Sequence, residues 1–511
     1  MIFRDWFNLD KTLSIGDWPY LFLENIREFS WWPQSPFLWL EPYYQITAKI
    51  GLEIFHFSWP LIERLFWFWP FLFLIIFCSY RLTRSWLGVL IYATNTYILM
   101  IVGGGQMGVA MAYSLAPLAL GLFINHSRVN ELTSLQVKKF NSLINNSLIK
   151  NKVIPGFILG LQMMFDPRLA LLTAAAAFFY CLFVSRPRPW RSFFSVGLVA
   201  LLLNLFWLIP WLRFSQEASP TLIEVDFFSF ASFSNTIALL HPNWPENIFG
   251  KLYFMKPEFL VLPILAFSSL ILSINHSRVN ELTSLQVKKF NSLINNSLIN
   301  NKGILYFSLL GLIGAFLAKG TRPPFGEIYF SLFKYLPGFN LFRDPTKFYL
   351  LTALSYAILI PRLIGGRRGL KLIFVIFWLF TIRQAVLGQL GGTFQGTAVP
   401  QEYLALKAFL QQDDQSTPVF WFPQRQRFGF QSLDHPAVEG FVLSTEEELR
   451  ELGVKYVIIP FDSEKEIFLD DHQYSEAKRQ EFVAELNQLD FLEKLEPENF
   501  AKIDIYEYRS F

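Results

Sequence analysis

Long runs of apolar residues, separated by short polar connections, dominate the first 390 residues of the chain. A helix needs about 20 apolar residues to cross the hydrocarbon core of a bilayer, and fewer where neighbouring helices shield it. By this criterion the pattern predicts a bundle of about ten transmembrane helices, of which the fourth and fifth are short enough to form a broken or re-entrant pair. The predicted helices cover residues 61–80, 85–101, 107–123, 153–165, 169–184, 192–213, 256–273, 303–319, 346–363 and 372–390.

The pattern changes from about residue 400, where charged residues become frequent and helix and strand periodicities alternate. This favours a mainly α fold: a polytopic transmembrane bundle over 56–390 followed by a small α/β domain over 391–511. The C-terminal region contains neither a glycine-rich phosphate loop nor a nucleophile motif. We therefore expect it to have a supporting or substrate-guiding role. Its predicted helices are 401–412, 445–452 and 474–488, and its predicted strands are 419–422, 455–460 and 502–508.

Composition agrees with a membrane protein and excludes several other classes. Of the 511 residues 52% are hydrophobic and only 17% are charged, against about 25% charged in soluble proteins. The net charge of +3 gives no concentrated basic surface for nucleic acid. The two cysteines, Cys78 and Cys181, both lie in apolar runs, which indicates neither a disulfide framework nor a cysteine-based metal site.

The distribution of basic residues predicts the orientation of the bundle. Cytoplasmic loops of membrane proteins carry an excess of Lys and Arg. Here the basic residues gather in alternate connections, so we expect a multi-pass protein of the cell membrane in which segment 1–55 and the C-terminal domain are extracytoplasmic. The basic residues concerned are Arg81, Arg84, Arg186, Arg188, Arg191, Arg367, Arg368 and Lys371.

This orientation requires the N-terminal segment to cross the membrane without an obvious signal. Residues 1–55 contain no signal peptide with a basic start and a continuous apolar run. We therefore expect that a first helix is missing, either because the true start lies upstream or because the protein is a truncated family member.

Residues 124–149 and 274–299 are identical, and both copies fall in predicted cytoplasmic connections. Structural repeats normally diverge in sequence and span whole supersecondary units. Perfect identity in unrelated flanks instead indicates a recent duplication or a translated mobile element, which a loop tolerates at little entropic cost. The alternative is a paired amphipathic helix that binds a partner.

With these insertions set aside, the outward connections are the long ones, and the candidate chemistry lies in them. Asp17 follows Gly16 and precedes Pro19 by two positions, which indicates a defined turn that fixes a carboxylate near the membrane surface. The alternative is an interfacial loop whose aromatic residues form a belt.

Three other outward segments carry candidate polar residues. Arg343 and Lys347 could hold the phosphate of a lipid carrier, or Arg343 could simply pair with Asp344. Asp166 and Arg168 occupy the tip between the two short helices, as a cap or as part of a cavity. His241 could bind a phosphate or a sugar hydroxyl, or be an ordinary surface histidine.

No pair among the six histidines has the spacing of metal ligands, so we expect no metal site and no cofactor.

Several short motifs together resemble polytopic glycosyltransferases of the GT-C type, most of all the membrane domain of bacterial arabinofuranosyltransferases and YfhO-like proteins. The resemblance covers nearly the whole chain outside the two insertions, and the Phe-Arg-x-Pro-x-Lys-Phe element is its strongest part. The motifs are the early Gly-Asp loop, Gly-Gly-Gly-Gln (103–106), Tyr-Ser-Leu-Ala-Pro (113–117), Asp166-Pro-Arg168, the segment 337–348 and Leu-Gly-Val-Lys-Tyr-Val-Ile (452–458).

The resemblance implies an enzyme that moves a sugar from a polyprenyl-phosphate donor to an extracytoplasmic glycan, lipid or protein acceptor. It makes Asp17 the candidate catalytic base and Arg343 and Lys347 the candidate donor-phosphate ligands. Asp166, Arg168 and His241 are possible cavity residues from their positions in the sequence. The missing first helix departs from the family and would leave this chain inactive if it is truncated. The competing interpretation is a non-catalytic transporter, translocase or assembly factor for lipid-linked glycans, which buried acids in mid-helix would favour.

Overall fold

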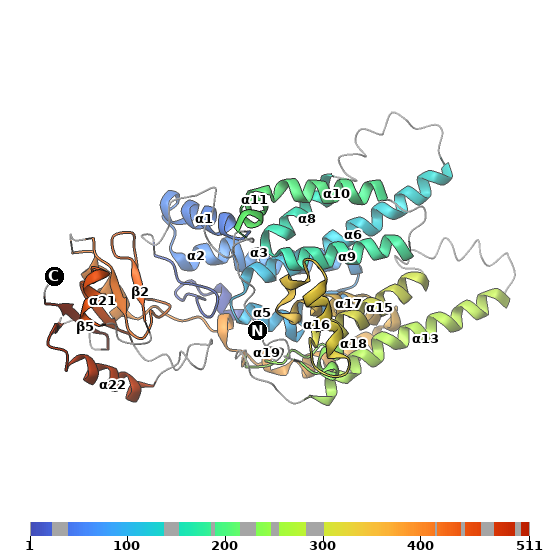
Figure 1. The fold of residues 1–511 in the computed structure, drawn as a ribbon. Helices are drawn as coiled ribbons and strands as arrows, with labels where there is room; N and C mark the ends of the chain where they lie inside the picture. The colour runs from blue at the N-terminus through green and yellow to red at the C-terminus, as the bar shows by residue number, and fades with distance from the viewer. Residues whose placement is uncertain are drawn as a thin grey trace.

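The computed structural model describes a mainly helical protein with a small C-terminal sheet. Figure 1 shows a bundle of long helices with the sheet at one end. The described residues are 2–22, 39–136, 153–184, 190–214, 231–246, 255–282, 301–413, 416–440, 445–460, 475–495 and 502–509.

Within these residues four helical stretches are long and apolar enough to cross a membrane, or up to six if each of two bent helix pairs forms one span. This supports a multi-pass membrane protein, but the described residues do not support the prediction of about ten spans. The four stretches are Trp59–Thr83, which comprises α2 (Trp59–Glu63), η4 (Arg64–Phe68) and α3 (Trp69–Thr83); the first part of α6 (Met107–Gln136); α15 (Asn301–Ala318); and η10 (Pro345–Phe348) with α17 (Tyr349–Ile364).

Two predicted spans are bent because an asparagine interrupts the helix. Asn95 separates α4 (Trp86–Thr94) from α5 (Thr96–Gly103) at 46°, and its side chain both caps α5 and donates to the Tyr92 carbonyl. Asn204 separates α10 (Trp190–Leu203) from α11 (Leu205–Phe214) at 78°. Its amide donates to the carbonyls of Gly160 and Ala200.

The apolar helices at the remaining predicted spans have fewer than 18 residues, so they are short for a membrane-spanning helix. The fourth and fifth form α8 (Ile154–Phe165) and α9 (Pro167–Phe183), which Asp166 separates. The apolar part of the seventh ends at Ile271, within η8 (Pro257–Leu260) and α13 (Val261–Leu282). The tenth is α18 (Arg368–Thr381), and the short helix α19 (Arg383–Val386) follows it. Apolar runs therefore overestimated the number of spans, because polar residues and prolines divide them.

Small residues allow close packing in the middle of the bundle, as is usual between membrane helices. A Cβ atom at Gly311 of α15 would lie 2.5 Å from the Ser355 hydroxyl of α17, and one at Gly314 would lie 2.8 Å from Leu351 Cβ. The Ser355 hydroxyl donates to the Phe307 carbonyl at 2.7 Å. The two helices are thus joined by backbone-level contact as well as by apolar side chains.

Helices α6 and α13 both run beyond the bundle on the side opposite the sheet (Figure 1). Each carries the first residues of one copy of the repeat at its protruding end. Residues 137–149 and 283–299 of the two copies lie outside the described residues. The starts of the two insertions are therefore on one side of the molecule.

The C-terminal region forms a five-stranded mixed sheet in the order β2-β1-β3-β5-β4. β1 pairs in parallel with β2 and β3, while β5 is antiparallel to β3 and β4. The predicted helices and strands are present, but β2 and β4 were not predicted. The elements are α20 (Gln401–Leu410), β1 (Val419–Trp421), β2 (Ala437–Glu439), α21 (Glu446–Glu451), β3 (Tyr456–Ile459), α22 (Glu476–Leu486), β4 (Leu492–Leu495) and β5 (Asp504–Tyr508).

The N-terminal segment lies between the bundle and the sheet. Phe22 is buried in the apolar core that the sheet forms with α20, and the Tyr20 ring packs edge-on against Phe428. The Arg427 guanidinium donates to the Ser14 carbonyl at 2.9 Å. These contacts fix the segment that carries Asp17 against both parts of the molecule. The remaining described elements are η1 (Arg4–Phe7), α1 (Glu41–Lys49), η3 (Ile50–Ile54), α12 (Phe233–Ile237), α16 (Gly326–Tyr335), η9 (Phe339–Phe342) and η11 (Gly392–Phe394).

Candidate functional site

The Asp17 turn rests directly on the glycine-rich end of α5. The Asp17 amide donates to the Gly104 carbonyl at 3.0 Å. Gly105 has a φ of +81°, and a Cβ atom there would lie 2.5 Å from the Trp18 amide nitrogen. Only glycine fits this contact without displacement of the turn. The sequence Gly103-Gly104-Gly105 therefore brings the N-terminal loop onto the bundle.

Gln106 links this turn to the start of the Pro345–Ile364 span. The Gln106 side chain forms a hydrogen bond with the Asp17 carboxylate, and its Oε1 accepts a long hydrogen bond of 3.4 Å from Lys347 Nζ. Lys347 also pairs with the Asp344 carboxylate at 2.8 Å and is only 1% exposed. Polar groups from three distant parts of the sequence thus meet at one end of the bundle.

The protein around Asp17 affects its protonation. Desolvation raises the pKa of Asp17, and this outweighs the Gln106 hydrogen bond and the Lys347 cation, which both lower it. The residue is still exposed, so solvent limits the desolvation. A carboxylate with a raised pKa is a better proton acceptor than an ordinary aspartate, which is what general-base catalysis needs.

Asp166 and Arg168 form the polar tip between α8 and α9. The Asp166 carboxylate caps α9, because it accepts from the amides of Arg168 and Leu169, and it pairs with the Arg168 guanidinium at 2.6 Å. Arg168 also interacts electrostatically with Asp344, which joins the tip to the Lys347 group. The predicted cap is therefore present, and it lies beside the site.

The surroundings of Asp344 favour its ionised form. Desolvation raises its pKa, but the Lys347 ion pair, hydrogen bonds from Lys347 and Thr346, and the Arg168 cation together hold the pKa below its usual value. The Asp344 side chain also caps η10, since its Oδ1 accepts from the Thr346 amide at 2.9 Å. The sequence analysis considered Asp344 only as a partner for Arg343.

His241 lies in the same region but is uncharged at neutral pH. Its backbone amide donates to the Thr96 hydroxyl at 2.7 Å, and its Nδ1 accepts from the Asn243 amide at 3.2 Å. Burial lowers the pKa of His241 to about 3, although Asp344 acts in the opposite direction. A neutral imidazole can supply hydrogen bonds to a sugar hydroxyl, but no positive charge for a phosphate.

The two predicted phosphate ligands occupy different environments. Lys347 is buried within the polar group, whereas the Arg343 side chain is exposed. Arg343 precedes Asp344, whose carboxylate is bound by Lys347. Arg343 is therefore placed at the rim of the site rather than within it.

Tyr97 is a member of the site that sequence analysis missed. Its side chain is fully buried, and its hydroxyl has no hydrogen-bond partner among the described residues. Asp344, Asp166 and Arg168 all act on this hydroxyl electrostatically, and the Tyr349 ring stacks on the Tyr97 ring at 5.5 Å. A buried donor without a partner carries a desolvation penalty that a bound ligand could relieve. No local sequence signal distinguishes Tyr97 from other aromatic residues in apolar runs.

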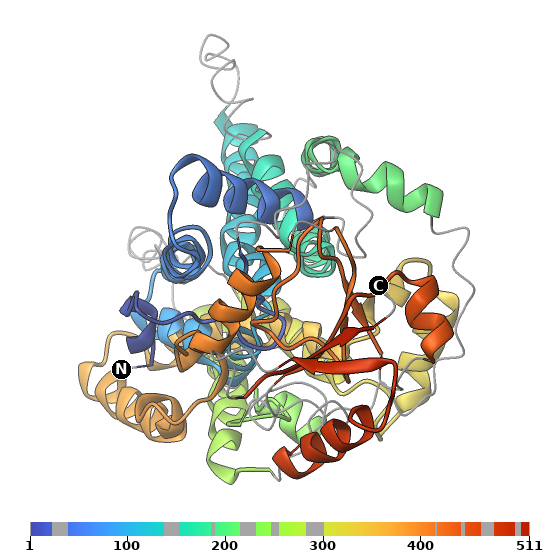
Figure 2. The same ribbon diagram turned by 90° about the vertical axis from the view of Figure 1, so that its left-hand side faces the viewer.

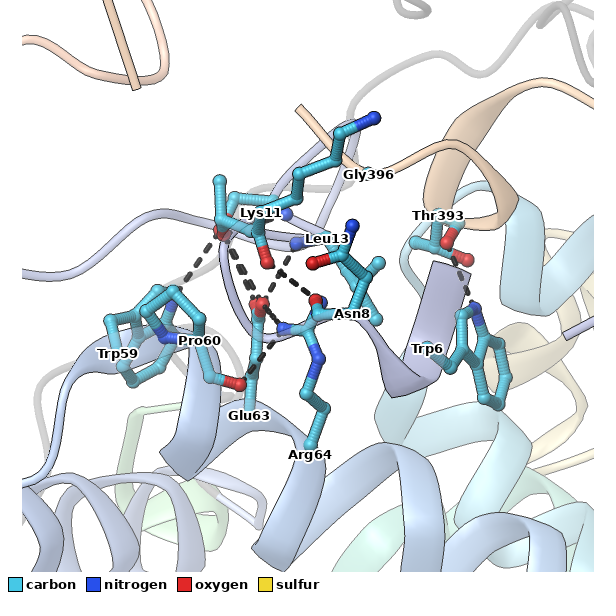
Figure 3. A network of polar contacts seen from close by, with 12 residues as sticks. Trp6, Asn8, Lys11, Leu13, Trp59, Pro60, Glu63, Arg64, Thr393 and Gly396 are labelled. Atoms are coloured by element: carbon cyan, nitrogen blue, oxygen red, sulfur yellow. Dashed lines mark hydrogen bonds and ion pairs between the residues drawn. The ribbon is translucent and has the colours of Figure 1, made fainter. Parts of the chain in front are cut away.

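A buried ion pair between Glu63 and Arg64 binds the loop that contains Asn8, Lys11 and Leu13 (Figure 3). Glu63 and Arg64 are both fully buried and 2.5 Å apart. Glu63 accepts from the Leu13 amide at 2.8 Å, and Arg64 donates to the carbonyls of Asn8 and Lys11. Both charged groups therefore bind the N-terminal segment, which explains their position within a span, and Arg64 also donates to the Pro60 carbonyl of its own helix.

Among the described residues no group of three or more His, Cys, Asp or Glu side chains could hold a metal ion. A comparison with models of known protein families matched none of them, and a comparison with curated proteins found no match.

Proposed function

We propose that this protein is a membrane glycosyltransferase of the GT-C type, which transfers a sugar from a polyprenyl-phosphate donor to an extracytoplasmic glycan, lipid or protein acceptor. One observation carries the proposal: the Asp17 carboxylate and the Lys347 ammonium group both contact the Gln106 side chain. A base and a cation are thus available within one site at the end of an apolar bundle, where a lipid-linked phosphate would enter.

In this proposal Asp17 accepts the proton of the acceptor hydroxyl as its oxygen attacks the anomeric carbon of the sugar. The bond between that carbon and the phosphate oxygen breaks, and polyprenyl phosphate leaves with the electron pair. Lys347 stabilises the negative charge on the leaving phosphate, and Arg343 binds the same phosphate from the rim. His241 and Tyr97 are suited to hydrogen bonds with uncharged parts of the sugar, because neither carries a positive charge.

The first test is native mass spectrometry of the protein purified in mild detergent. A co-purified or added polyprenyl phosphate that remains bound would support the donor site, and an attached sugar would identify the donor. The sugar-loaded lipid then serves in a transfer assay with the Asp17→Asn variant. We expect this variant to retain donor binding and to lose transfer, because an amide cannot accept the proton.

The matched control is Asp10→Asn, which changes an exposed aspartate of the same segment and should leave transfer unchanged. Since the pKa of Asp17 is raised, transfer should decline as the pH falls through that value, because only the ionised carboxylate is a base. If the protein retains only bulk phospholipid and does not bind added polyprenyl phosphate, the donor site is rejected. A normal transfer rate in Asp17→Asn would reject Asp17 as the base. Donor binding without transfer in the wild type would favour a lipid-linked glycan translocase.

A further inference from the structure

Helix α16 (Gly326–Tyr335) lies in the connection between two membrane-spanning stretches. The first, α15, ends at Ala318, and the second begins at Pro345. Successive spans place their connection on one side of the bilayer, and the contact between Tyr329 and Phe348 keeps α16 near the start of the second span. This is the side of the Asp17 site, because Lys347 next to Phe348 contacts Gln106. In the end view of Figure 2 the yellow ribbon of this segment runs along the margin of the bundle.

One face of α16 packs against the protein. The Tyr329 side chain is buried, and its hydroxyl donates to the Phe342 carbonyl at 2.5 Å. Its ring packs edge-on against Phe339 at 5.2 Å and against Phe348 at 6.3 Å. These contacts hold the helix in a fixed rotation about its own axis.

A second face of α16 is apolar and mostly exposed. Ile328, Leu332 and Tyr335 recur at intervals of four and three residues, which places them on one side of the helix. The flanking Phe325 and Leu336, which lie just outside the helix, add two exposed apolar side chains. Of these, Phe325 is 67% exposed and Tyr335 is 73% exposed, while Leu332 is half-buried. An open hollow of about 490 Å³ runs along this face, lined by Ile328, Leu332, Tyr335 and Leu336, with Glu327 and Ser331 at its edge.

The third face is polar. Glu327, Ser331 and Lys334 are exposed and share one side of the helix. The Lys334 ammonium group lies over the Tyr335 ring at 5.3 Å from its centroid. A lysine and a tyrosine at the junction of an apolar and a polar face are typical of helices at a lipid–water interface.

We propose that α16 lies in the bilayer interface, with the face formed by Phe325, Ile328, Leu332, Tyr335 and Leu336 inserted among the lipids of the leaflet nearer the Asp17 site. A lipid surface is the partner because α16 connects two stretches that are long and apolar enough to cross a membrane, and its Tyr329 ring packs against Phe348, directly before α17. A bilayer must also cover the exposed Leu305, Leu309 and Ile313 of α15 if that helix crosses it. The inference rests on the membrane-spanning helices and does not depend on glycosyl transfer.

The test uses an environment-sensitive dye on single introduced cysteines. Cys78 and Cys181 are buried, so a maleimide dye should react with the new cysteine, and the wild-type protein measures any background. Ile328→Cys places the dye on the apolar face, and Glu327→Cys places it on the polar face one residue away. Each full-length variant is reconstituted in phosphatidylcholine–phosphatidylglycerol vesicles, with and without lipids that carry a nitroxide quencher near the headgroup.

We expect the dye at position 328 to emit at shorter wavelength than the dye at 327 and to lose more of its fluorescence to the nitroxide lipids. Leu433→Cys is the control, because Leu433 is a 71% exposed apolar residue of the C-terminal region and should respond like position 327. Equal, water-like emission and weak quenching at 327 and 328 would overturn the proposal. A shift to shorter wavelength at 328 without quenching would also overturn it, and would indicate that protein, such as a second copy of the chain, covers this face.

Discussion

The Trp18 indole nitrogen donates a 2.9 Å hydrogen bond to Glu63 Oε2. Trp18 directly follows Asp17, and Glu63 lies in the first span, so this bond attaches the Asp17 turn to the bundle. Glu63 Oε1 binds the Leu13 amide on the other side of the turn. The position of the proposed base therefore depends on a carboxylate that is buried within the membrane domain.

Glu63→Gln is expected to destabilise the protein by about 3–5 kcal/mol, because it leaves the buried Arg64 cation without its anion. The measurement is thermal unfolding in detergent, followed by tryptophan fluorescence. Glu451→Gln removes an exposed carboxylate and should change stability by less than about 0.5 kcal/mol. Equal melting temperatures for the two variants would contradict the role given to the ion pair.

Tyr97→Phe is expected to leave stability unchanged or slightly higher, because the hydroxyl that it removes is buried without a partner. Tyr113→Phe is the comparison, since the Tyr113 hydroxyl accepts from Asn95 at 2.9 Å and donates to the Tyr92 carbonyl at 3.1 Å. Loss of these bonds should cost about 1–3 kcal/mol. If Tyr97 binds the donor, Tyr97→Phe should weaken retention of the lipid in native mass spectrometry without loss of stability. A clear destabilisation by Tyr97→Phe would show that its hydroxyl is already satisfied.

Asp166→Ala should destabilise the protein by about 0.5–2 kcal/mol, because it removes the cap of α9. Asp166→Asn keeps an acceptor for the α9 amides and loses only the charge that pairs with Arg168, so its cost should be smaller. Thermal unfolding of the two variants separates capping from ion pairing. If Asp166→Asn lost more stability than Asp166→Ala, the cap would contribute little.

Acid should destabilise the protein in part through Asp344. Its folded-state pKa lies below the ordinary value of 3.8, so the ionised carboxylate contributes stability above that value, and the contribution is lost as the pH falls below it. Asp344→Asn should cost about 1–3 kcal/mol at pH 7, because Lys347 is left buried without an anion. The measurement is unfolding at a series of pH values between 3 and 7. The variant should show a smaller loss below pH 4 than the wild type, and parallel curves would contradict this assignment.

The sequence allowed good prediction of elements that depend on local pattern. Helices such as α15 and α17, and the strands β1, β3 and β5, lie close to their predicted positions because apolar spacing and chain length decide them. The short strands β2 and β4 were missed, because three or four residues give too little periodicity. The number of predicted spans was too high for a different reason: an apolar run does not show where a polar residue such as Asp166 ends one helix and begins the next, which leaves α8 and α9 short.

The residue pattern alone indicates a helical membrane protein with a small C-terminal α/β region, and it points to six polar residues as candidates: Asp17, Asp166, Arg168, His241, Arg343 and Lys347. Which of these residues meet depends on the tertiary fold. Asp17 and Lys347 both contact Gln106, whereas the Arg343 side chain is exposed at the rim of the site. Tyr97, which the sequence did not indicate, lies close enough to interact with Asp344, Asp166 and Arg168. The reason is physical: hydrophobic burial is set by local periodicity, but a hydrogen bond or ion pair requires two particular atoms, often hundreds of residues apart, to be brought to within about 3 Å.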